Sequence, residues 1–179
     1  MAPFTSCLQR LGPAEKEFWR IPLRLESAEG KFGEGIQAAV THNSEGGIQS
    51  ATAAALMAHF FVYQYGSLTR LPHWINSNVE GNWSRPFEGK VGSKGWMSVS
   101  AAITAVSRNS SLAELLMDCM NFGGDVDTVA TIALAAASCS SDYTRDIPEI
   151  LVDELENGKY GRDYIMELDA KLAELVPAE

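Results

Sequence analysis

The feature that most constrains this chain is a glycine-glycine-acid turn at residues 123–125, followed by a run of small apolar residues at 129–137. Two adjacent glycines let the backbone turn tightly, and an acidic residue before such a run is typical of a helix start. Asp125 takes the N-cap position, and Asp127 and Thr128 fall in the first helical turn, where free amides and the helix dipole favour negative charge. The sequence therefore predicts a helix that begins at a rigid turn.

The side chains of this turn allow two interpretations. Asp125, Asp127 and Thr128 are either helix-capping residues or ligands of a cation. Their hard oxygen donors, closely spaced at a turn, suit Mg²⁺ or Mn²⁺. The spacing alone does not choose between capping and metal binding.

Composition narrows the class of protein. A chain of 179 residues, 46% hydrophobic and 21% charged, predicts one globular domain. The net charge of -9 argues against sequence-independent binding to the phosphates of nucleic acid. Cys7, Cys119 and Cys139 are odd in number and lack CxxC spacing, which is typical of reduced thiols. Without a signal peptide or an apolar run of about 18 residues, we expect a cytoplasmic protein that does not enter a membrane.

The apolar spacing is helical along most of the chain, and no segment alternates with a period of two. The predicted fold class is all-α, a compact helical bundle. Residues 1–35 are expected to form an N-terminal arm of uncertain structure, and residues 36–179 a helical domain. Helices are predicted at about 36–41, 48–65, 97–108, 112–120 and 125–137, then from Pro148 and over about 163–175. Near the C-terminus, Ile147, Ile150, Leu151 and Leu155 are expected to be buried.

Residues 66–96 are interpreted as one long connection that carries Trp74, Trp83, Phe87 and Trp96. Long connections inside a compact domain are usually functional or pack against something. These aromatic side chains either stack on a ring-shaped substrate or anchor the connection to the helices. His42, at a predicted helix corner, is likewise either a structural hydrogen-bonding residue or a ligand-binding one.

Three stretches together resemble the ADP-ribosylglycohydrolase family. Residues 123–133, GGDVDTVATIA, are similar to its GGDxDTxAAIAG signature, with Thr131 where the family commonly has alanine. Residues 40–48, VTHNSEGGI, resemble its Thr-His-Asn helix corner, and residues 95–102, GWMSVSAA, a glycine-aromatic turn that leads into a helix. Their order and spacing agree, so the resemblance covers roughly residues 36–175.

The resemblance implies an all-helical hydrolase with a binuclear Mg²⁺ or Mn²⁺ centre that acts on ADP-ribose or an ADP-ribosylated protein. It implies that Asp125, Asp127 and Thr128 are metal ligands, with Asp125 and Asp127 also catalytic. It further implies that Gly95, Trp96 and His42 lie near the bound ADP-ribose.

The chain departs from the family pattern in its N-terminal part. The GDxxG segment and the Thr-Asp-Asp run that supply the other metal ligands in the family are not found here. The resemblance is therefore to the C-terminal half, which provides a half-site. Three hypotheses follow: one half of a glycohydrolase completed by another chain or a homodimer, a non-catalytic relative that binds ADP-ribose-like ligands or a protein partner, or a purely structural helical module.

Overall fold

The computed structural model describes residues 38–41 and 43–174. The described part is helical and contains no strand, so the all-α prediction is confirmed. After a helical turn at residues 38–41, the elements are α4 (Glu45–Val62), η1 (Leu68–Arg70), α5 (Leu71–Asn78), α6 (Gly95–Arg108), α7 (Leu112–Asn121), α8 (Val126–Ala137), α9 (Glu149–Asp153) and α10 (Arg162–Glu174). Within these residues, no helix combines the length and the apolarity that a membrane crossing requires.

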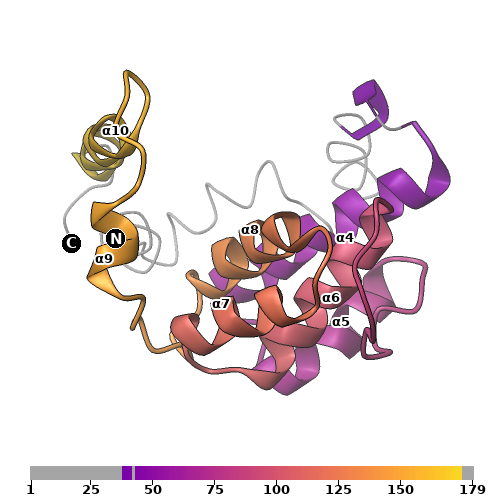
Figure 1. Cartoon of the computed structure of the whole chain (residues 1–179). Helices are drawn as coiled ribbons and strands as arrows, with labels where there is room; N and C mark the ends of the chain where they lie inside the picture. Colours follow the sequence, from indigo (N-terminus) through magenta and orange to yellow (C-terminus); the bar gives the residue numbers. More distant parts are fainter. Residues whose placement is uncertain (1–37, 42, 175–179) are drawn as a thin grey trace.

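Helix α6 lies at the centre of the body formed by α4 to α8 and packs against all four neighbours (Figure 1). Small side chains make this possible, because they let helix axes approach closely while larger residues fill the remaining gaps. Small buried residues occupy α6 and α8, and the large ones come mainly from α4, α5 and α7. They include Ala101, Ala102, Ala105, Ala133 and Ala137, with Leu56, Met57, Phe60, Ile75 and Leu115 between them.

Side-chain caps fix where two of these helices start. Ser44 Oγ accepts a hydrogen bond from the Gly47 amide at 3.2 Å and opens α4. Ser111 Oγ accepts from the Glu114 amide at 3.1 Å and opens α7, as the Ser-x-x-Glu pattern predicts. Each cap satisfies an amide that the first turn leaves without a helical partner.

The connection predicted at 66–96 is partly wrong, because its first half is helical. The 3-10 turn η1 runs directly into α5, which carries Pro72 in its first turn. Proline is favoured there, since the missing N–H is not needed and its fixed φ suits a helix. Only residues 79–94 form the irregular connection to α6.

The C-terminal helices form where the apolar spacing predicted them, but their apolar residues are not buried. Figure 1 shows α9 and α10 set apart from the body of α4 to α8. Of the residues predicted as core, Ile147 is partly buried against the body. Ile150, Leu151 and Leu155 are instead about half exposed, and so are Ile165 and Leu168. Periodicity identified the apolar face of each helix, whereas burial also requires a surface that covers that face.

Candidate functional site

The glycine-glycine-acid turn is held against the loop that precedes α6. Gly123 and Gly124 adopt φ of 69° and 83°, in the left-handed region that glycine enters without a steric cost. Val91 donates to the Gly123 carbonyl at 3.0 Å and its own carbonyl accepts from the Asp125 amide at 3.2 Å. These two bonds make a short parallel bridge and fix the position of the acidic residue.

Asp125 occupies the N-cap position of α8, but its side chain makes no capping hydrogen bond. Its carboxylate instead accepts from two hydroxyl groups. Thr128 Oγ1 donates to Oδ1 at 2.7 Å, and Ser98 Oγ, on α6, donates to Oδ2 at 3.4 Å. The capping interpretation is therefore wrong for this side chain. Ser98 is only 2% exposed, so the orientation of Asp125 depends on the packed core.

Asp127 and Thr128 lie on the exposed side of the first turn of α8, and Asp125 is half-buried beside them. The predicted ligand residues thus lie on one helix start. Within residues 38–41 and 43–174, no group of three or more acidic, histidine or cysteine side chains is arranged to hold a metal ion. The side chains that this turn offers to a ligand are two carboxylates and one hydroxyl group.

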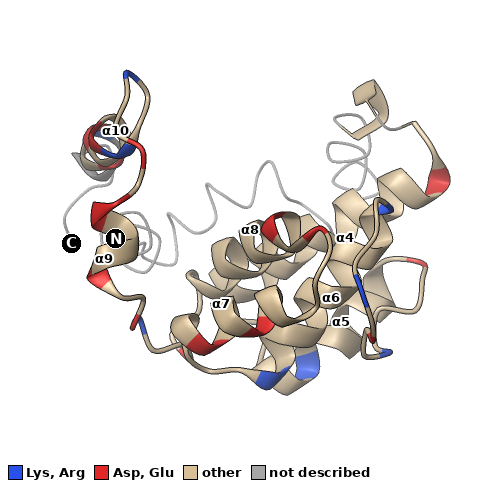
Figure 2. Ribbon diagram, in the orientation of Figure 1, with Lys and Arg blue, Asp and Glu red and all other residues tan. Residues whose placement is uncertain are grey.

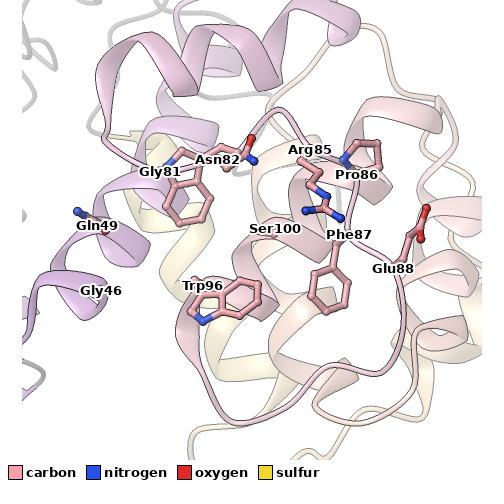
Figure 3. Close-up of a pocket in the computed structure, with 11 residues that line it drawn as sticks. Gly46, Gln49, Gly81, Asn82, Arg85, Pro86, Phe87, Glu88, Trp96 and Ser100 are labelled. Carbon is pink, nitrogen blue, oxygen red and sulfur yellow. The ribbon is translucent and has the colours of Figure 1, made fainter.

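A second feature is a pocket of about 690 Å³ between the starts of α4 and α6 and the 81–88 loop (Figure 3). That volume is in the range of roughly 300–1,000 Å³ typical of small-molecule sites. Gln49, Asn82 and Arg85 give it polar groups, and Phe87 and Trp96 an aromatic wall. The Phe87 and Trp96 rings meet edge to face, with centroids 6.3 Å apart and planes at 65°.

The pocket loop is fixed by hydrogen bonds to α5 and α6. Asn76 Oδ1 accepts from the amides of Trp83 at 2.6 Å and Ser84 at 3.3 Å. Further along, Thr104 Oγ1 accepts from the Phe87 amide at 2.8 Å. Since both acceptors belong to helices of the core, the aromatic wall has a defined position before any ligand binds.

Of the aromatic residues predicted either to stack on a ligand or to anchor the connection, some anchor it and others line the pocket. Trp74 lies in a ring cluster with His59 and Tyr65, and the buried Trp83 donates from its indole nitrogen to the Glu80 carbonyl at 3.1 Å. Both anchor the chain, although Trp83 also touches the pocket. Trp96, by contrast, is 50% exposed and lines the pocket.

The first two turns of α6 separate the pocket from the acidic turn. Trp96 and Ser100, four residues apart, line the pocket, whereas Ser98 between them bonds to Asp125. Positions i and i+4 share a helix face and position i+2 lies nearly opposite. The acids of the turn are accordingly not among the residues that line the pocket.

The other predicted ligand residues are placed as follows. Gly95 starts α6 against α4, where an added Cβ would come within 3.3 Å of Ser50 Cβ. His42 lies outside the described residues. Arg85 was not singled out from the sequence, because one arginine in a glycine-rich loop has no motif. Its place among the pocket residues identifies it.

The helical fold and the acidic helix start define the class of protein. A sequence model of the ADP-ribosylglycohydrolase family matches residues 35–179, most of the chain. The protein belongs to this family, and its function is of the glycohydrolase type. No curated protein and no solved structure gave a significant match.

Proposed function

We propose that the chain carries half of a divalent-metal centre that hydrolyses the N- or O-glycosidic bond of an ADP-ribosylated substrate. Asp125, Asp127 and Thr128 are the protein's metal ligands in this proposal, and a complementing chain or a second copy provides the others. The observation that carries it is the state of Asp125, whose carboxylate is oriented by two hydroxyl donors and does not cap the helix.

The donor set fits a hard cation. An ionised carboxylate has about four acceptor positions, and the bonds from Ser98 and Thr128 use two at Asp125. Thr128 directs its hydroxyl proton to Asp125, so its oxygen lone pairs remain for a cation. Carboxylate and hydroxyl oxygens are the ligands that Mg²⁺ and Mn²⁺ prefer.

The acids of this chain would orient the substrate's ribose and a water at the glycosidic bond. Bound divalent ions would supply electrostatic stabilisation of charge that develops at the anomeric centre. Asp127, exposed beside Asp125, is placed to hold a water or a ribose hydroxyl by hydrogen bonding. Ser98 keeps the Asp125 carboxylate in position through a bond from the core.

A complementing chain is part of the proposal for two reasons. Three donors leave half of one octahedral coordination shell to other groups, and a binuclear centre needs still more ligands. In addition, α9 and α10 expose the apolar residues Ile150, Leu151, Ile165, Met166 and Leu168, and exposed apolar residues that occur together often mark an interface. A half-domain that docks on a partner would bury such a surface.

The first experiment is calorimetric titration of Mg²⁺ and Mn²⁺ into the full chain. We expect saturable binding that Asp125→Ala abolishes and that the matched control Asp142→Ala, an exposed acid after α8, retains. Unchanged binding by Asp125→Ala would contradict the proposal. The second experiment measures the release of ADP-ribose from ADP-ribosylated arginine and serine peptides over a range of protein concentrations. A second copy that completes the site would make the activity per chain rise with concentration.

The alternative is a non-catalytic relative that binds ADP-ribose-like ligands or a protein partner. The observation that favours it is the pocket at the start of α6, which the acids do not line. ADP-ribose binding that needs neither metal ion nor Asp125, in a chain without metal affinity, would select this alternative.

A further inference from the structure

Residues 149–174, which contain α9 and α10, form a C-terminal arm that is held together by its own hydrogen bonds. Asn157 Nδ2 donates to Asp163 Oδ2 at 2.8 Å, and Asn157 Oδ1 accepts from the Asp163 amide at 2.9 Å. Arg162 Nη1 donates to the Asp153 carbonyl at 2.7 Å. These bonds join the end of α9 to the start of α10, so the arm presents a defined surface.

The chain leaves the body of α4 to α8 at residues 147–148. Just before this point, Tyr143 donates from its hydroxyl to the Val106 carbonyl at 2.7 Å. Asp146 accepts from Ser111 Oγ at 2.6 Å and from the Ala113 amide at 3.0 Å. Among the described residues, Ile147 is the last apolar residue that packs on the core. The arm therefore starts beside the C-terminal end of α6.

The C-terminal arm is both apolar and acidic on its surface. Of the twelve large apolar residues that are exposed in the described part of the chain, eight lie within residues 150–168. Residues 149–174 also hold eight acidic and three basic residues, a net charge of -5. Exposed apolar residues that occur together often mark an interface. Two such arms would repel each other, so the charge favours docking on a basic surface.

A basic surface with an exposed aromatic residue lies at the other end of α6. Residues 85–94, here called the basic loop, hold three basic residues and one acidic residue, a net charge of +2 in a chain of net charge -9. Trp96, 50% exposed, follows this loop. Figure 2 shows the basic residues along the loop and the acidic residues along the arm, on opposite sides of the molecule. The basic loop and Trp96 thus complement the arm in charge and in apolar character.

The other exposed apolar pair of the body is less suitable. Met117 and Met120 lie on α7, where Glu114 is also exposed. The nearby Arg108 is already paired with Asp118 at 2.6 Å. An acidic arm would meet no net positive charge there, whereas it would at the basic loop.

The arm meets a basic loop only on another molecule in this arrangement. It starts at the C-terminal end of α6, whereas the basic loop precedes the N-terminal end. A helix of 14 residues places these ends about 20 Å apart. If two copies exchange their arms reciprocally, a two-fold axis relates two identical contacts and the assembly closes as a dimer.

We infer that the C-terminal arm docks on the basic loop and Trp96 of a second copy of this chain. The docked arm would border the acidic turn of that copy, because a Cβ built at Gly124 would lie 3.1 Å from Lys90 Cγ in the basic loop. That the second copy also completes the half-site rests on the proposed function.

The first test is sedimentation equilibrium of the full chain in EDTA over a wide range of concentrations. We expect a monomer–dimer equilibrium whose dissociation constant rises with salt, because salt screens exposed charges. Lys94→Glu should raise this constant about ten-fold, since an attraction becomes a repulsion. Lys94 is the N-cap residue of α6, where the helix dipole favours a carboxylate, so the variant should fold. Arg145→Glu, the same charge change outside the arm and the loop, is the matched control.

The apolar part of the contact has its own variant. Ile165→Glu in α10, at a residue 61% exposed in the single chain, should raise the dissociation constant about 30-fold, as loss of a central apolar contact does. Met117→Glu, an equally exposed apolar residue on α7, should leave it unchanged. A chain that stays monomeric at every concentration would overturn the inference, and so would a dimer that Lys94→Glu and Ile165→Glu leave intact.

A cross-linking experiment locates the contact. A carbodiimide joins a lysine amine to a carboxylate that touches it, and a mixture of isotopically labelled and unlabelled chains separates links between copies from links within one. We expect links between copies that join Lys90 or Lys94 to acidic residues of 149–174. Links of this kind only within one chain, or only between two arms, would refute the arrangement. The metal titration of Asp125→Ala tests the proposed function separately, since another complementing chain could still complete the half-site of a monomer.

Discussion

Replacement of Gly124 by alanine tests how the acidic turn is built. A Cβ at this position would collide with the Val91 carbonyl oxygen and lie 3.0 Å from the Val91 carbonyl carbon. That carbonyl is the acceptor for the Asp125 amide. Gly124→Ala therefore forces the two segments apart at the point where they hold Asp125.

Gly123→Ala is the matched control, because the two glycines share a left-handed φ but differ in their surroundings. At Gly123 the nearest atom to an added Cβ is Lys90 Cγ at 4.0 Å, an ordinary contact. A left-handed conformation costs an L-residue about 1–2 kcal/mol. The entropy that alanine removes from the unfolded chain offsets about 0.4–1 kcal/mol of this cost. We expect a net destabilisation of about 0.5–1 kcal/mol for Gly123→Ala.

In Gly124→Ala, the same cost of the left-handed conformation and the same entropic offset apply, and the steric conflict with Val91 is added. Forced backbone shifts in packed surroundings cost about 1–3 kcal/mol. The expected loss is therefore about 2–4 kcal/mol, a large part of the stability of about 5–15 kcal/mol typical of a domain. Because the shift displaces the Asp125 amide from Val91, Mg²⁺ affinity should fall as well.

The assay is urea unfolding at 25 °C, followed by circular dichroism at 222 nm, with wild type, Gly123→Ala and Gly124→Ala compared at one protein concentration. Metal titration of the folded variants follows under the same buffer. Equal losses of stability for the two variants would refute the reasoning, since the conflict with the Val91 carbonyl is the main difference between the two sites.

Three further changes test separate interactions. The two carboxylate oxygens of Asp118 accept hydrogen bonds from Nε and Nη2 of Arg108, each at 2.6 Å, and these bonds lower the pKa of Asp118. The pair with Arg108 therefore stabilises the fold above about pH 4, and this stabilisation is lost as the pH falls through the lowered pKa of Asp118. Asp118→Asn should cost about 1 kcal/mol in urea unfolding at pH 7 and less at pH 3. Asn76→Ala leaves two amides of the pocket loop without their acceptor, and should cost about 1 kcal/mol by the same assay and weaken ADP-ribose binding. Ser98→Ala removes a hydroxyl that orients Asp125, so Mg²⁺ affinity should fall about ten-fold.

Each of these has a contradicting result. An effect of Asp118→Asn that does not diminish in acid would mean that the pair with Arg108 is not its source. Unchanged ADP-ribose affinity in Asn76→Ala would show that ligand binding does not depend on the hydrogen bonds between the pocket loop and Asn76 of α5. Unchanged Mg²⁺ affinity in Ser98→Ala would exclude orientation of Asp125 through α6, and Ser107→Ala, a serine that bonds within α6 itself, controls for helix stability.

Local signals were sufficient for the starts of α7 and α8. The glycine pair before Asp125 and the Ser111 cap are patterns of a few residues, and the structure has α8 and α7 beginning where these patterns predict. The sequence does not indicate α5, although Pro72 lies in its first turn, because polar residues and nearby glycines are typical of a connection. Its eight residues are too few to give a clear apolar period.

The errors in the site and in burial have a different origin. The partner of Asp125 on α6 is 27 residues away, so capping, a local preference, was the natural prediction for its side chain. The burial of Ile150 and Leu151 is not a local property either. Their helix was predicted, but whether these side chains are buried depends on which other part of the structure packs on them. Arg85 acquires a meaning only through Phe87 and Trp96, which tertiary structure brings to the same pocket.

Within the described residues, the bonds that hold the acidic turn all come from the body of α4 to α8. Its supports are Val91 in the loop before α6, Ser98 within α6 and Thr128 within α8, and α6 and α8 pack directly on each other. None of these bonds involves α9 or α10, which carry the exposed apolar residues. A complementing chain would therefore meet a carboxylate that already has its orientation, and would need to contribute ligands and cover apolar surface without remodelling the turn. Pre-orientation of this kind keeps the ordering cost of assembly low, because the half-site does not have to fold when the partner binds.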